Sequence, residues 1–394
     1  MVSIDVDRIY KVRKSMEENK IDVLILRLSE NVLFLSGYWP LNGFSFIVFF
    51  IEKDPVLIIP EGEKKYAENS WVKDIRLFGW GKVYDENPYT SISNNLRELL
   101  NKNARNKYRI GYEGSFETVA PAHMAGEVMV PSQITLNMLN STLLNAEFID
   151  ATPMINKLRA TKTRREIEKI KLANEIACFG LQEFLVGCED GIKEAELESR
   201  VYSMIHTMGV GYKGAVSVCC WPNIMSGKRT SFAHRPYLIS EDKFLKKGDL
   251  VVLELATVVD GYWSDLTRTK VVGKANKRQL EIFNVVEKAQ DSAIKKIKPK
   301  VLERDVDKEA REFIKSNGYE DYFVHHTGHG IGFKYHEPYP FLHPEAVGVL
   351  QEGMVTTVEP GVYIEDFGGI RIEDDILVTS EGFEYLSEFK CSLD

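Results

Sequence analysis

Apolar and polar residues follow two different periods along the first 150 or so residues. Segments 5–21 and 92–103 carry apolar residues at helical spacing, whereas 22–28, 44–51, 54–60 and 108–113 are short runs typical of strands. The run FSFIVFFI (44–51) is apolar throughout, so we expect it to form a buried central strand. Helices and strands that alternate in this way predict a small mixed α/β domain over residues 1–155.

A long amphipathic helix over 155–185, where charged residues separate apolar ones at helical spacing, is expected to open a second domain, residues 156–394. This domain contains a weak internal repeat. ELE (196–198) aligns with DVD (305–307) at an offset of 109 residues, and each copy reads as two helices that end at a glycine. The hairpins KKGDLVVLELA and QEGMVTTVEPG align at an offset of 105 and place Glu254 on Glu359. The repeat predicts two halves related by an approximate twofold axis.

Carboxylates fall at matching places in these two halves. The apolar stretch LVVLELATVVDGYWSDLTRT (250–269) contains Glu254 and Asp265, and the second copy has Glu359 and, if three residues are gained, Glu373. Four converging anions would raise one another's pKa unless positive charge is supplied, so we expect divalent metal ions there. His329 lies between two glycines, whose backbone freedom would let its ring point inward as a nitrogen ligand. Without a thiolate, these donors favour manganese, cobalt or iron over a structural zinc.

Such a site predicts hydrolysis. Two metal ions about 3.5 to 4 Å apart lower the pKa of a water toward neutrality and polarise a carbonyl oxygen. This is the apparatus for cleaving an amide bond.

Composition limits the classes of partner that the chain is expected to bind. The net charge of −8 and the pI near 5.7 argue against nucleic acid or an anionic membrane. The five cysteines show neither an even count nor a CxxC spacing, and the amino terminus lacks the apolar segment of a secretory signal. We therefore expect a cytoplasmic protein that binds neither nucleic acid nor membrane.

Four motifs of the second domain resemble those of the creatinase and prolidase family, the pita-bread (M24) metallopeptidases that include Xaa-Pro dipeptidase and aminopeptidase P. They are SDLTRTKVVG (264–273), HTGHGIGFKYHE (326–337), GMVTTVEPGVY (353–363) and GGIRIEDDILVT (368–379). NVLFLSGY and LRATKTRREIEKIKLANEIA resemble the two-domain branch, so the resemblance covers essentially the whole chain. It implies an α+β chain, with a small α/β creatinase-type domain before a pita-bread domain of pseudo-twofold symmetry.

The resemblance also implies a site. The ligands of two divalent ions (Mn, Co or Zn) would be Glu254, Asp265, His329, Glu359 and Glu373. The residues that would act on the substrate, move protons or orient a ligand carboxylate are His234, His325, His336, Glu359 and Arg371. Of the adjacent His325 and His326, we expect at most one to face the site. The implied enzyme is a metallopeptidase that hydrolyses Xaa-Pro bonds of dipeptides or short peptides, in a homodimer whose amino-terminal domains cap the partner's site.

Glu254 departs from the family, which normally has aspartate at this position. One extra methylene reaches about 1.3 Å further, whereas metal sites tolerate about 0.2 Å in ligand distance. Two ions, one ion, or a metal-poor pocket in which Glu254 acts as base or nucleophile all stay open. The last case would resemble the creatinase and ectoine-hydrolase branches, which split non-peptide C–N bonds. A binding role alone, as in the histone chaperone FACT, goes with broad loss of the ligands, which this chain does not show.

Overall fold

The chain forms two compact units. A computed structural model describes residues 4–41, 44–80, 85–100, 107–115, 132–235, 239–387, 389–390 and 392–393. Among these residues, those up to Arg159 form one unit and those from Ala160 onward form the other. Among the described helices, none is long and apolar enough to cross a bilayer.

The first unit is built on a six-stranded mixed sheet with the order β4-β3-β2-β1-β5-β6. Its strands are β1 (Val23–Leu26), β2 (Phe46–Phe50), β3 (Val56–Pro60), β4 (Asp74–Phe78), β5 (Arg109–Tyr112) and β6 (Glu147–Asp150). The helices are α1 (Val6–Glu18), α2 (Ser29–Ser36), α3 (Lys64–Ala67), α4 (Pro88–Leu100), α5 (Ser132–Thr142) and α6 (Thr152–Ala160). Strand β2 lies inside the sheet with all five residues buried, which confirms the predicted central strand.

The helix expected over 155–185 is two helices in the structure, α6 and α7 (Arg164–Gly187). The break lies at Thr163, whose backbone N–H donates to Glu166 Oε2 at 2.7 Å, and this reciprocal cap starts a new helix. Just before it, the N–H of Lys162 donates to the carbonyl of Gly353 at 2.8 Å. The T-x-x-E signature of such a cap is present in the sequence and would have predicted the break.

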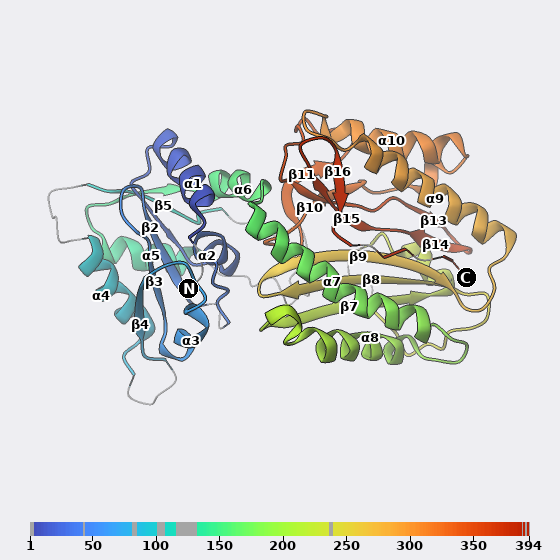
Figure 1. The fold of residues 1–394 in the computed structure, drawn as a ribbon, viewed down its shortest axis with the longest axis horizontal. Helices are drawn as coiled ribbons and strands as arrows, with labels where there is room; N and C mark the ends of the chain where they lie inside the picture. The colour runs from blue at the N-terminus through green and yellow to red at the C-terminus, as the bar shows by residue number, and fades with distance from the viewer. Residues whose placement is uncertain are drawn as a thin grey trace. The chain divides into compact units, whose positions relative to one another are not determined.

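The second unit consists of two halves, each with a helix pair and its own sheet (Figure 1). The first half contains α7, α8 (Glu194–Gly209), β7 (Val218–Ser226), β8 (Leu250–Val259) and β9 (Tyr262–Val271), in the strand order β7-β8-β9. The second half contains α9 (Lys277–Lys296), α10 (Glu303–Ser316), a sheet in the order β11-β10-β12-β15-β16, and the β13-β14 hairpin. These strands are β10 (Gly328–Gly330), β11 (Glu337–Leu342), β12 (Val355–Val358), β13 (Gly361–Ile364), β14 (Gly368–Arg371), β15 (Asp374–Val378) and β16 (Phe383–Tyr385).

The internal repeat read from the sequence is confirmed. Helices α8 and α10 begin at Glu194 and Glu303, which are 109 residues apart. Gly248 and Gly353, 105 residues apart, precede β8 and β12 with left-handed φ values of 88° and 84°. The same two offsets relate a pair of isolated backbone bridges, Lys193 with Phe244 and Leu302 with Val349.

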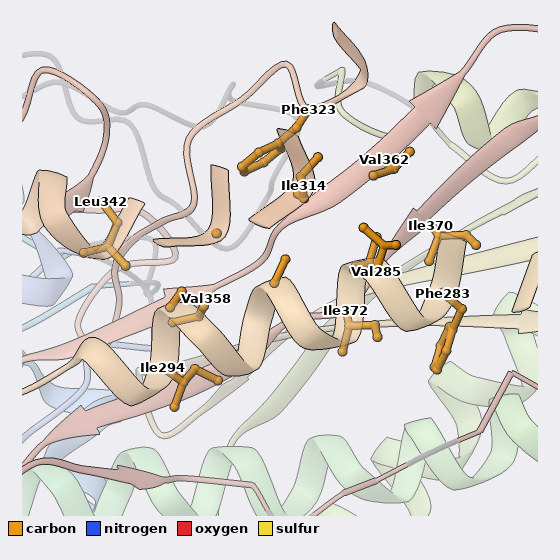
Figure 2. Packing of buried hydrophobic residues seen from close by; sticks show 14 of the residues in the cluster. Phe283, Val285, Ile294, Ile314, Phe323, Leu342, Val358, Val362, Ile370 and Ile372 are labelled. Carbon is orange, nitrogen blue, oxygen red and sulfur yellow. The ribbon is translucent and has the colours of Figure 1, made fainter. Parts of the chain in front are cut away.

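Each half has its own hydrophobic cluster, one under α7 and α8 and the other under α9 and α10. In the second half, Phe283 and Ile294 of α9 and Ile314 of α10 pack with Val358 and Ile370 from the strands (Figure 2). Full burial of such a side chain contributes about 1.5 to 3 kcal/mol. This packing against α9 and α10 therefore fixes the strands of the second half, which carry polar residues of the candidate site.

Candidate metal centre

Glu254 and Asp265 project from one face of the β8-β9 ribbon. Glu254 pairs with Thr267 and Ala256 with Asp265 in the antiparallel register. Since alternate residues of a strand share a face, Asp265 and Thr267 lie on the side that Glu254 occupies. The two carboxylates are therefore diagonal neighbours on adjacent strands.

His329 is the middle residue of β10, between Gly328 and Gly330. The two glycines serve close packing, not the backbone freedom that we expected. A Cβ at Gly328 would lie 1.9 Å from the carbonyl oxygen of Thr357, and one at Gly330 would lie 2.0 Å from that of Tyr339. The His329 Nδ1 contacts the carbonyl of Gly330 at 2.9 Å, which directs Nε2 toward the carboxylates.

Glu359 and Glu373 complete the cluster from the second half. Glu359 directly follows β12, and its Oε1 lies 3.6 Å from His329 Nε2. Glu373 lies between β14 and β15, and its backbone N–H donates to the carbonyl of Thr267 at 3.1 Å. Because this contact joins β9 to the second half, Asp265 and Glu373 meet at the seam between the repeats.

Three of these residues converge tightly enough to hold an ion. One ligand atom each from Asp265, His329 and Glu373 lies within 4.8 Å of the others. The Thr267 hydroxyl donates to Glu373 Oε2 at 2.6 Å, but Glu373 Oε1 is buried without a hydrogen-bond partner in the described part of the chain. A buried carboxylate oxygen without a donor is costly, and a cation satisfies it. These carboxylates and the imidazole therefore fit a divalent ion of the hard or borderline class.

The protonation of the cluster is set first by burial. Burial raises the pKa of Glu373 to about 7. Burial, followed by the charge of Glu373, raises the pKa of Asp265 and of Glu359 well above the ordinary values. Burial lowers the pKa of His329 to about 4, so its imidazole is neutral at pH 7 and available as a ligand.

These shifts predict how the stability of the metal-free chain depends on pH. A carboxyl group whose folded pKa is raised stabilises the fold below its unfolded pKa, and the contribution is lost as the pH rises through the folded value, about 7 for Glu373. The pKa of His329 is lowered, so this residue changes the free energy of unfolding only below pH 6.5, its ordinary pKa. Between pH 6.5 and 8 we therefore expect the free energy of unfolding to fall by about 1 to 2 kcal/mol.

Urea unfolding at both pH values, with a chelator and with saturating Mn²⁺, checks this expectation. Because the ion displaces these protons, the stabilisation by Mn²⁺ should grow over the same interval. A metal-free chain that is more stable at pH 8 than at pH 6.5 would contradict the assignment.

Glu254 has partners of a different kind. Its Oε2 accepts a hydrogen bond from the Arg371 guanidinium at 2.7 Å, and its Oε1 accepts one from the Tyr335 hydroxyl at 3.0 Å. Arg371 also donates to the carbonyl of Ala233 at 2.8 Å and lies 3.9 Å from Glu373 Oε2. Arg371, expected to orient a ligand carboxylate, thus holds Glu254 most closely.

Of the three predicted histidines, His336 lies beside a ligand of the cluster, and His234 and His325 lie beside Tyr363. The ring of His336 packs on His329 with centroids 4.2 Å apart, and its Nδ1 has no hydrogen-bond partner among the described residues. His234 and His325 flank Tyr363, at a ring distance of 5.1 Å for His234 and at 2.9 Å between His325 Nε2 and the Tyr363 hydroxyl. Burial lowers the pKa of each of the three histidines, which favours their neutral forms.

Of the adjacent His325 and His326, only His326 is close to a ligand carboxylate, and His325 contacts Tyr363. His326 Nε2 lies 3.6 Å from Glu359 Oε1, while His325 reaches Arg371 through Tyr363, whose hydroxyl accepts from Arg371 at 3.1 Å. Residues 324–327 do not form a strand, so adjacent side chains need not alternate between faces.

Sequence reasoning also missed residues that support the ligands. Asp375 Oδ2 accepts the backbone N–H of Asp265 at 3.1 Å and the side-chain amide of Asn174 at 2.9 Å. The Tyr335 hydroxyl lies 3.1 Å from Asp265 Oδ1. The adjacent acids of IEDD were a visible signal for Asp375, whereas Tyr335 differed from other aromatic residues only in standing next to His336.

The fold and the site together define a metal-dependent hydrolase of duplicated architecture. Residues 168–380 match the model of metallopeptidase family M24, and residues 8–161 match the creatinase/prolidase N-terminal domain. The Xaa-Pro dipeptidase of Pyrococcus furiosus is 34% identical over 382 residues, which are 97% of this chain and 98% of the relative.

Solved structures agree. The prolidase of Pyrococcus horikoshii OT3 has a TM-score of 0.79 at 30% identity, covering 98% of this chain and 100% of that one. An Xaa-Pro dipeptidase from Bacillus anthracis has a TM-score of 0.80 at 28% identity, covering 98% of each chain. The chain belongs to metallopeptidase family M24. The expected α+β architecture of two domains and the expected peptidase class are confirmed, and divalent metal use comes with the family.

Proposed function

We propose that the chain hydrolyses the bond before proline in Xaa-Pro dipeptides or short peptides, as a metallopeptidase dependent on divalent ions such as manganese, cobalt or zinc. The observation that carries this proposal is the buried group of Asp265, His329 and Glu373, beside Glu359, at the seam of the two repeats. The relatives named Xaa-Pro dipeptidase or prolidase support the choice of substrate. We further propose a cytoplasmic homodimer in which the amino-terminal domains limit the length of the substrate.

The proposed roles of the residues follow from their positions. The ligands would be Asp265, His329, Glu359 and Glu373, with Glu254 on the far side of Asp265 as a fifth candidate. When bound, divalent ions lower the pKa of water and polarise the peptide carbonyl. Glu359 accepts the proton of the attacking water and passes it toward the leaving nitrogen of proline.

His234 and His336, whose lowered pKa values favour the neutral imidazole, donate hydrogen bonds to the developing oxyanion and the leaving nitrogen. Arg371 keeps Glu254 in place, and His325 fixes the hydroxyl of Tyr363 next to Arg371.

A substrate panel tests the proposal. The full-length chain, with and without Mn²⁺ or Co²⁺, is offered Xaa-Pro dipeptides, Xaa-Pro-Yaa tripeptides, matched Xaa-Ala peptides, creatine and ectoine. We expect metal-dependent cleavage before proline and no cleavage of the alanine controls. Because Glu254 is held by Arg371 and Tyr335, the second candidate is a hydrolase of a non-peptide C–N bond. Turnover of creatine or ectoine without metal, together with no Xaa-Pro cleavage, would favour it.

A further inference from the structure

Tyr335 is a buried phenol for which the proposed peptidase chemistry has no use. Its side chain is 2% exposed and lies in the loop between β10 and β11. Its ring packs against Trp263 with centroids 5.7 Å apart and meets His336 edge-on at 4.4 Å. Trp263 in turn stacks on Trp221 at 5.5 Å. These aromatic contacts fix the ring, so the hydroxyl has little freedom to withdraw.

The hydroxyl of Tyr335 lies between two ligand carboxylates. It is 3.0 Å from Glu254 Oε1 and 3.1 Å from Asp265 Oδ1. The hydroxyl therefore lies within hydrogen-bond distance of both carboxylates. An ion shared by Glu254 and Asp265 would need the same two oxygens, so it would compete with the hydroxyl for them. The other oxygen of Glu254 accepts from Arg371, so each oxygen of Glu254 has a donor.

The opposite side of Asp265 is arranged differently. Asp265 meets His329 and Glu373 there in the group whose ligand atoms lie within 4.8 Å, and Glu359 Oε1 lies 3.6 Å from His329 Nε2. Both oxygens of Glu254, by contrast, are hydrogen-bonded to Tyr335 and Arg371. Within the described residues, Glu373 Oε1 has no hydrogen-bond partner. The side chain of Glu254 is also 29% exposed, against 3% for Asp265 and 2% for Glu373. Its longer arm thus leads away from the buried group and toward Arg371.

We propose that Tyr335 closes the Glu254 side of the centre, so that the chain binds one divalent ion tightly and a second ion only by displacing the Tyr335 hydroxyl. The tight ion is held by Asp265, His329, Glu359 and Glu373. This inference rests on the proposed metallopeptidase centre and narrows it to unequal ion positions. Tyr335 is then a positioning residue, which sets the number of ions without contacting the substrate.

The test measures ion binding, not turnover. The metal-free full-length chain is titrated with Mn²⁺ by calorimetry, and the bound ions are followed by electron paramagnetic resonance. We expect one tight ion with the spectrum of an isolated Mn²⁺, then a much weaker second ion. Tyr335→Phe keeps the ring and removes a hydrogen bond to a charged group, so it should strengthen the second site by about 10- to 100-fold. An exchange-coupled Mn²⁺ pair should then form at correspondingly lower Mn²⁺.

Two further variants test the role of Tyr335. Tyr38→Phe is the matched control, because Tyr38 is also buried and also donates to a buried glutamate, Glu63, but in the other compact unit. It should leave both ion affinities unchanged. Glu254→Asp shortens the arm that reaches Tyr335 and Arg371, so it should strengthen the second site even if Tyr335→Phe fails to fold.

Three outcomes would overturn the inference. Equal binding of two ions by the unaltered chain would remove the role of Tyr335 and leave the peptidase function intact. Weaker binding by Tyr335→Phe would make the phenol oxygen a ligand instead of an obstacle. Binding of no ion by any variant would reject the metal centre itself, and with it both proposals.

Discussion

Glu359→Gln should abolish peptide hydrolysis while leaving the fold intact. Glu359 Oε1 lies 3.6 Å from the ring nitrogens of His326 and His329, and it accepts a hydrogen bond from Thr357 at 3.3 Å. The amide has the same shape but cannot accept the proton of the attacking water, and it is a weaker ligand. Loss of a general base costs about 10²- to 10⁴-fold in kcat, and weaker ion binding adds to the loss.

The measurement is kcat on an Xaa-Pro dipeptide at saturating Mn²⁺, together with the midpoint temperature of unfolding. Because the substitution removes one of several repelling buried anions, the metal-free variant should be at least as stable as the unaltered chain. Glu352→Gln, in the exposed turn before β12, is the matched control and should keep full activity. Near-normal turnover by Glu359→Gln would refute the role of Glu359.

Arg371→Met should cause the largest loss of stability among substitutions at the seam. Arg371 is 3% exposed and donates to Glu254, to the carbonyl of Ala233 and to the hydroxyls of Tyr363 and Thr267. Methionine fills much of the volume but leaves a carboxylate unpaired among other anions. Removing one partner of a buried ion pair costs about 3 to 5 kcal/mol, roughly 10 °C in midpoint temperature for a unit of this size.

Thermal unfolding of the metal-free chain at pH 8 checks this expectation, since the carboxylates are most charged there. Arg304→Met replaces an exposed arginine of α10 and should change the midpoint by little. The double variant Glu254→Gln with Arg371→Met should recover part of the loss, because it removes the stranded charge. A single-variant loss below about 1 kcal/mol would show that Arg371 does not hold the acidic cluster together.

Much of the second unit was predictable because its sequence contains an internal repeat. The offset of 109 residues between the helix pairs and of 105 between the hairpins holds in the backbone, down to the left-handed glycines before β8 and β12. Such a duplication places equivalent residues on equivalent elements, so Glu254 could be aligned with Glu359 before any distance was known. The break between α6 and α7 was not predicted, although the capping sequence at Thr163 that causes it is visible in the chain.

The sequence by itself determined the two domains, the central strand of the first, the duplicated halves of the second and the acidic and histidine residues at their seam. Periodicity and motifs depend on residues that are close in the sequence or that recur at a fixed offset, so they can be identified without the structure. Only the tertiary structure decided which partner each carboxylate has. The bonds from Tyr335 to Asp265 and Glu254 span 70 and 81 residues, and the bond from Arg371 to Glu254 spans 117. No spacing rule links positions so far apart, because their contact depends on how the two halves pack together.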